Sequence, residues 1–184
     1  METCLSNRIL IVDDEEHILK ALERVLMDED YEIITTTSSE EALDLVRRRP
    51  FKVIISDECM PNMYGSELLA KISLRQPEVV KMLLTGYASV EAAIRAVNQG
   101  EIYRFLVKPW DGFELKMSLR SGIEKYDLEM KNRKLQSLVR TQAYRLAAKT
   151  GAPPGHAEID EAAVIDLMTA DEIASLLVEC GIEM

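Results

Sequence analysis

The stretch ILIVDDEE at residues 9–16 decides the fold. Four apolar residues in a row, three of them β-branched, are typical of a strand that is covered on both faces, as in a parallel sheet between helices. Acidic residues follow this strand at once. In an open parallel α/β sheet, ligands bind beyond the carboxyl ends of the strands, so these acids stand where chemistry is expected.

Four further apolar runs predict four more strands. They lie at residues 33–34, 53–55, 79–84 and 105–107. Apolar side chains between the runs recur with helical spacing, at Ile18, Leu22, Val25 and Leu26 and again from Val90 to Val97. Ser38 or Ser39, and Ser89, stand where helix N-caps belong, and Gly100 where a helix ends. Alternating strands and helices predict an α/β fold with a doubly wound, five-stranded parallel sheet.

A long helix is predicted after the last strand. Its apolar stripe, which we expect to pack on the sheet, consists of Leu115, Leu119, Ile123, Tyr126 and Met130. We expect a first domain at 1–127, a basic helical extension at 128–149, a Gly/Pro linker at 150–157 and an acidic tail of two short helices at 158–184. A weak second apolar stripe on the extension is compatible with a homodimer.

Charge is unevenly distributed along the chain. Acidic residues number 32 and basic residues 22, which gives a net charge of −10 and argues against nucleic acid or an anionic membrane as the default partner. Residues 131–149 carry six basic residues and no acid, whereas residues 150–184 carry eight acids and no Lys or Arg. One interpretation is that the basic stretch 131–149 is a solvated helix face. The other is that it attracts the acidic tail, or an acidic patch on a second copy of the chain.

The cysteines and the hydropathy pattern indicate a reduced, cytoplasmic protein. Cys4, Cys59 and Cys180 are far apart, and no metal-binding Cys/His spacing occurs. We expect no disulfide framework, no signal peptide and no transmembrane segment.

Polar side chains follow the predicted strands at the edge where ligands are expected. They are Asp13 and Asp14 after the first strand, Asp57 after the third, Thr85 and Gly86 after the fourth, and Lys108 and Pro109 after the fifth. Clustered carboxylates repel one another, so Mg²⁺, bound through oxygen, is a natural counter-ion. A carboxylate beside such an ion can accept a phosphoryl group, whose oxygens an ammonium and a hydroxyl group stabilise. Taken singly, each residue also fits a structural role, such as an N-cap or a turn.

Four motifs resemble those of the bacterial response-regulator receiver domain, over residues 7–127. They are ILIVDDE at 9–15, DxxMPxxxG from Asp57 to Gly65, LTGY at 84–87 and FLVKP at 105–109. The resemblance implies a flavodoxin-like fold, with Gly65 as a structural position. It further implies that Asp57 accepts a phosphoryl group from a sensor histidine kinase or a phosphotransfer protein.

The resemblance also implies a Mg²⁺ site around the acceptor. Asp14 and Asp57 would ligate the ion. Asp13 would act through a water molecule, and the backbone carbonyl of Cys59 would complete the set. Glu58 and Cys59 flank the acceptor, at positions whose side chains influence the lifetime of the phosphoryl group.

A phosphoryl-binding and switch set is implied in the same way. Thr85 would supply the switch hydroxyl, and Phe105 the aromatic side chain that turns inward when Thr85 moves. Lys108 would contact the phosphoryl group, and Pro109 matches the usual cis-peptide position. Family members often carry Tyr in place of Phe105 and Ala in place of Gly86, so one hydroxyl is lost and the site should be more open.

The remaining sequence predicts a signalling switch and not an enzyme. Residues 100–110 are also similar, more loosely, to receivers attached to HD-type cyclic-dinucleotide phosphodiesterases, but no His-Asp pair follows and residues 130–184 are few for such a domain. Residues 169–177 resemble the first helix of a helix-turn-helix, so a DNA-binding transcription regulator is the alternative. We expect output through protein–protein contacts, on the face of the fourth helix, fifth strand and last helix.

Overall fold

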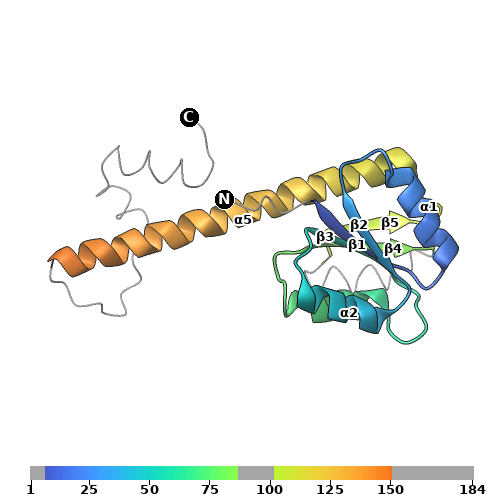
Figure 1. The fold of residues 1–184 in the computed structure, drawn as a ribbon, viewed down its shortest axis with the longest axis horizontal. Coiled ribbons are helices and arrows are strands. Elements are labelled where there is room, and N and C mark those ends of the chain that lie inside the picture. The colour runs from blue at the N-terminus through green and yellow to red at the C-terminus, as the bar shows by residue number, and fades with distance from the viewer. Residues whose placement is uncertain (1–6, 87–101, 151–184) are drawn as a thin grey trace. The chain divides into compact units, whose positions relative to one another are not determined.

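The structure is a computed structural model that describes residues 7–86 and 102–150, with the backbone alone for residues 142–150. It contains a five-stranded parallel sheet with the order β2-β1-β3-β4-β5 (Figure 1). The strands are β1 (Arg8–Val12), β2 (Glu32–Thr36), β3 (Val53–Asp57), β4 (Val80–Thr85) and β5 (Arg104–Val107). The chain winds outward from β1 to β2 and then crosses back to β3, so the predicted doubly wound fold is confirmed.

Helices cover both faces of the sheet. The described helices are α1 (Glu16–Leu26), α2 (Ser39–Arg48), α3 (Gly65–Ser73) and α5 (Gly112–Thr150). Apolar residues of α1 and α5 pack with Ile9 and Ile11 of β1, whereas those of α2 and α3 pack with Leu10 and Val12. The alternation of β1 side chains between two cores explains why the whole run is apolar.

Several predicted segments lie outside the described residues. They are the helix from Val90 to Val97 with its caps at Ser89 and Gly100, residues 151–157 of the predicted linker, and the helical tail at 158–184. The first residue of that linker, Thr150, is the last residue of α5.

A polar cap fixes the start of α2. The Ser38 side chain accepts a hydrogen bond from the backbone N–H of Glu41 at 3.3 Å, and the Ser38 carbonyl accepts one from Ala42. The predicted N-cap is therefore confirmed at Ser38, and it satisfies an amide that helix geometry leaves without a partner.

The apolar stripe of α5 is confirmed for four of its five members. Leu115 and Leu119 are fully buried, Ile123 is 8% exposed and Tyr126 is 6% exposed, but Met130 is 39% exposed. The prediction for Met130 is wrong, because the compact unit that contains the sheet ends at Asp127. Lys52, beside β3, contacts the Asp127 carboxylate at 2.7 Å at that point.

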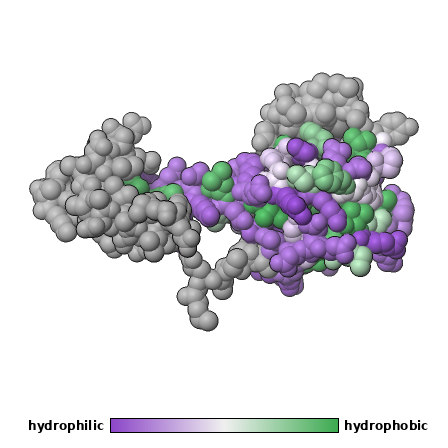
Figure 2. Space-filling view, turned by 90° about the horizontal axis from the view of Figure 1, so that it is seen from above, coloured by the Kyte–Doolittle hydropathy of each residue, from purple (hydrophilic) through white to green (hydrophobic). Residues whose placement is uncertain are grey.

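On the face that Figure 2 shows, the described residues are mainly hydrophilic, with apolar areas between them. Val107, Phe113 and Met117 are among the exposed apolar residues, on β5 and the first turns of α5. None of the described helices is both long enough and apolar enough to cross a lipid bilayer.

Candidate functional site

Two acidic side chains meet at the carboxyl edge of the sheet. Asp57 is the last residue of β3, and Asp13 directly follows β1, its neighbour in the sheet. Asp13 is fully buried and Asp57 is 4% exposed. Two carboxylates so far removed from water need a cation or hydrogen-bond donors close by.

Lys108 provides that cation. Its Nζ atom lies 2.7 Å from Asp13 Oδ2 and 2.6 Å from Asp57 Oδ1. The residue directly follows β5, where its backbone N–H donates to the Thr85 carbonyl at 2.8 Å and its bond to Pro109 is cis. The structure therefore brings together residues that lie up to 95 positions apart in the chain.

The electrostatics of this triad follow from burial and pairing. Burial raises the pKa of Asp13, and the hydrogen bond and charge of Lys108 only partly offset that effect. Burial alone would lower the pKa of Lys108, but the hydrogen bonds and charges of Asp13 and Asp57 outweigh it, so the pKa is raised. Lys108 is therefore a permanent cation at neutral pH.

Backbone amides bind the remaining carboxylate oxygens. The N–H of Cys59 donates to Asp57 Oδ2 at 2.6 Å, and the N–H of Glu15 donates to Asp13 Oδ1 at 3.0 Å. The Cys59 residue is exposed, yet partial burial of its sulfur together with the charge of Asp57 raises the pKa of the thiol. The thiol is thus held in its protonated, less reactive form.

Gly65 lies against the backbone of the acceptor. A Cβ atom at this position would lie 2.0 Å from the carbonyl oxygen of Asp57 and 2.9 Å from Ser56 Oγ. Its N–H donates to the Glu58 carbonyl at 3.0 Å, so α3 begins in contact with the loop after β3. Only glycine permits an approach this close.

The three other residues of the predicted phosphoryl-binding and switch set lie on β4 and β5 or directly after β4. Thr85 is the last residue of β4 and is 5% exposed, and Phe105 of β5 packs partly buried against the core on the α2 and α3 side. Gly86 follows Thr85, and among the described residues a Cβ added to it would meet no atom within 4 Å.

Oxygen donors at this edge fit Mg²⁺. Asp13 and Asp57 offer buried carboxylate oxygens, and the backbone carbonyl of Cys59 belongs to the adjoining loop. Among residues 7–86 and 102–141, no three carboxylate, imidazole or thiol side chains converge on one point, and Asp14 is exposed. Mg²⁺ retains several waters and usually needs only one or two carboxylates, so this donor set is sufficient.

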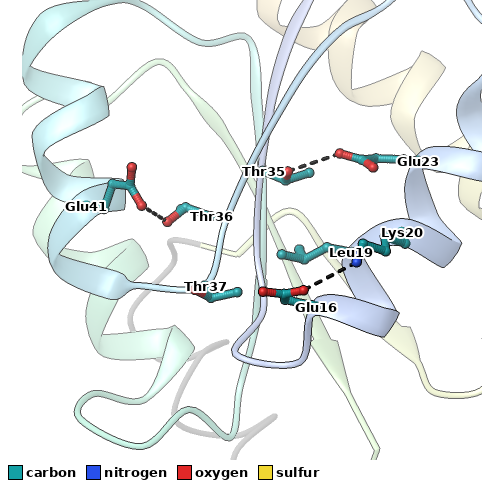
Figure 3. Close-up of a pocket in the computed structure, with 8 residues that line it drawn as sticks. All are labelled: Glu16, Leu19, Lys20, Glu23, Thr35, Thr36, Thr37 and Glu41. Atoms are coloured by element: carbon teal, nitrogen blue, oxygen red, sulfur yellow. Dashed lines mark hydrogen bonds and ion pairs between the residues drawn. The ribbon is translucent and has the colours of Figure 1, made fainter.

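A separate cavity of about 410 Å³ lies between α1, α2 and the end of β2 (Figure 3). It contains none of the predicted site residues. Its polar side chains bind one another: Glu16 pairs with Lys20 at 3.3 Å, Thr35 donates to Glu23 at 3.0 Å, and Thr36 donates to Glu41. We therefore assign the chemistry to the edge around Asp57.

A doubly wound sheet with two buried carboxylates and a partly buried lysine at its carboxyl edge is the arrangement expected of a receiver domain. The sequence model of the response regulator receiver domain matches residues 9–120, so the chain belongs to this family of two-component systems. Receiver domains are signalling domains and are generally not enzymes. The resemblance noted from the four motifs is thus confirmed.

Three comparisons illustrate this relationship. The hydrogenase transcriptional regulatory protein HoxA of Cupriavidus necator is 36% identical over 133 residues, which are 72% of this chain and 27% of HoxA. The receiver domain of an HD domain-containing protein from Pseudomonas fluorescens Pf-5 is 35% identical, with a TM-score of 0.67, over 71% of this chain and 96% of that one. The beryllofluoride-activated NtrC4 receiver domain dimer is 32% identical, with a TM-score of 0.62, over 65% and 98%. The chain spans about a quarter of the length of the curated relatives it matches.

Sequence reasoning identified the triad but missed the contacts of Glu58. The Glu58 carboxylate accepts hydrogen bonds from both the N–H and the hydroxyl of Ser66, at 2.9 and 3.1 Å. The signal in the sequence was a second acidic residue directly after Asp57.

Proposed function

We propose that this chain accepts a phosphoryl group on Asp57 from a histidine kinase or phosphotransfer protein, with Mg²⁺ as cofactor. The observation that carries the proposal is the Lys108 ammonium within 2.7 Å of two carboxylates, Asp13 directly after β1 and Asp57 at the end of β3. The family match supports it, because receiver domains generally depend on Mg²⁺.

The residues would act as follows. A carboxylate oxygen of Asp57 attacks phosphorus, and the bond between phosphorus and the donor imidazole nitrogen breaks. The imidazole carries a proton on its other ring nitrogen and therefore leaves neutral. Lys108 donates hydrogen bonds to a phosphoryl oxygen, and the Thr85 hydroxyl donates to another. Mg²⁺, held by Asp14, Asp57 and the Cys59 carbonyl, with Asp13 acting through water, would neutralise charge on the phosphoryl group.

A phosphoryl mimic tests this proposal on the full chain. Beryllofluoride with Mg²⁺ should raise the melting temperature of the wild type, since a ligand that binds only the folded state stabilises it. Neither Asp57→Asn nor the wild type without Mg²⁺ should respond. Asp44→Asn, the same chemical change on an exposed residue of α2, should respond as the wild type does. A full response from Asp57→Asn would contradict the proposal.

For the output we propose protein–protein contacts, with the face of β5 and α5 as the contact surface. Exposed Val107 and Phe113 support this surface, at 53% and 75% exposure. We include a second copy of this chain among the partners, because the NtrC4 receiver was solved as a dimer. The +6 and −8 charge blocks would add a salt-sensitive attraction. If removal of residues 150–184 alters neither oligomeric state nor salt response, the tail has no such role.

The names of the relatives favour a second candidate. HoxA and GlrR are named as transcriptional regulatory proteins, so DNA binding through residues 169–177 is the alternative. A gel shift with duplex DNA at physiological salt separates the two, because protein-mediated output predicts no shift. We place either function in the cytoplasm, on the basis of the widely spaced cysteines.

A further inference from the structure

Glu58 immediately follows the acceptor, and its side chain is buried at the start of α3. The residue is 5% exposed. Oε2 accepts a hydrogen bond from the N–H of Ser66 at 2.9 Å, and Oε1 accepts one from the Ser66 hydroxyl at 3.1 Å. A carboxylate with two donors makes strong, directional bonds and suits the N-terminus of a helix, where amides lack partners.

The backbone of Glu58 is also fixed on both sides. Its N–H donates to the Leu84 carbonyl at 2.9 Å, and its carbonyl accepts from Gly65 at 3.0 Å. All four polar positions of this residue are therefore engaged, one with β4 and three with the first residues of α3. The acceptor loop and the start of α3 form one hydrogen-bonded unit.

This unit contains the atoms that orient the acceptor. The N–H of Cys59 donates to Asp57 Oδ2 at 2.6 Å, and the Cys59 carbonyl belongs to the same short turn. A rotation of the peptide that follows Glu58 would swing the Cys59 N–H away from Asp57 and tilt the metal-binding carbonyl.

We propose that Glu58 is a positioning residue: through Ser66 it holds the Asp57–Cys59 turn in the geometry that binds Mg²⁺. The proposal rests on the function proposed above. It assigns Glu58 no contact with the ion or the phosphoryl group.

Two other roles for Glu58, one through its charge and one through fold stability, predict different Mg²⁺ affinities for the variants. If Glu58 acts through its negative charge, Glu58→Gln should weaken Mg²⁺ binding as much as Glu58→Ala, and Ser66→Ala should have no effect. If Glu58 only stabilises the fold, any variant of equal stability should bind Mg²⁺ equally. Positioning predicts rescue by Gln, because its oxygen can accept from the Ser66 N–H and its NH₂ can donate to the Ser66 hydroxyl.

The experiment is a Mg²⁺ titration of the full chain, followed by the fluorescence of Trp110, the single tryptophan, which lies two residues after Lys108. Loss of a group that orients a metal ligand weakens metal binding about 10- to 100-fold, and we expect a change of this size for Glu58→Ala. Ser66→Ala should weaken binding less, since the Ser66 N–H remains, and Glu58→Gln should bind close to the wild type. Glu29→Ala, which removes ion pairs with Lys116 and Arg120, is the control for lost stability and should bind normally.

Amide hydrogen exchange gives a readout that does not depend on the metal. Glu58→Ala should speed exchange at Cys59 and Ser66, whereas Glu58→Gln should not. Wild-type Mg²⁺ affinity in folded Glu58→Ala, or weak binding in Glu58→Gln equal to that of Ala, would overturn the positioning role alone. Failure of the wild type to bind Mg²⁺ would overturn the proposed function and this inference together.

Discussion

Replacing Gly65 by alanine tests how tightly α3 is joined to the acceptor loop. The new Cβ would lie 2.0 Å from the Asp57 carbonyl oxygen and 2.8 Å from its carbon. Ordinary contact begins at 3.4 Å, so backbone must separate by about 1.4 Å, since neither partner is a flexible side chain. We expect a loss of about 3 kcal/mol in the free energy of unfolding, which is the upper part of the range for overpacking.

Urea unfolding followed by circular dichroism measures this loss, and two other glycines serve as controls. At Gly122 a Cβ meets the end of the flexible Met82 side chain at 2.7 Å and Val80 Cγ1 at 3.2 Å, and at Gly86 it meets none of the described residues within 4 Å. Gly122→Ala gains helix propensity of about 1 kcal/mol against a small repacking cost, so it should be nearly neutral. Gly86→Ala should also be neutral. If Gly65→Ala is as stable as these controls, the close approach of Gly65 to Asp57 is refuted.

Three further substitutions probe charged groups, each by unfolding measurements. Asp13→Asn should raise stability at pH 7, because burial raises the pKa of Asp13 and makes its ionised form costly in the folded state. The gain should vanish below pH 3.8, where the carboxyl is protonated in both states, and an equal gain at all pH values would contradict this cause. Lys52→Met should lower the free energy of unfolding by about 1–2 kcal/mol. This is less than the loss of a fully buried ion pair costs, because the side chain of the partner Asp127 is 44% exposed. No loss would show that the contact does not contribute to stability. Glu29→Gln should lower the melting temperature at pH 7, since Arg120 lowers the pKa of Glu29. The difference in melting temperature between wild type and variant should shrink as the pH falls below 4.5, and a constant difference would refute the ion pair.

The sheet and the triad could be predicted because both depend on local patterns. The run at 9–12 reads as a strand covered on both faces, and Asp13 must then stand at its carboxyl end. The same reasoning places Asp57 and Lys108 at one edge, and the structure confirms that they meet. Parallel strands make such inference possible, since all their carboxyl ends share one edge.

The missed features depend on contacts between residues whose spacing carries no signal. Glu58 and Ser66 are eight positions apart across a loop, and Lys52 and Asp127 are 75 apart. The exposure of Met130 had a different cause: helical periodicity identifies the buried face of α5, but it contains no information about where the sheet beneath it ends.

Lys108 stabilises this edge of the fold, whereas Mg²⁺ would serve the proposed reaction. Because the ammonium lies between the two buried carboxylates, the chain carries an internal counter-ion and needs no dissolved ion to hold this edge together. Structural zinc domains differ, since they unfold when the metal is withdrawn. Under the function proposed above, the supply of Mg²⁺ would set how many molecules are ready to react, whereas Lys108 pairs with the two carboxylates whether or not the ion is bound.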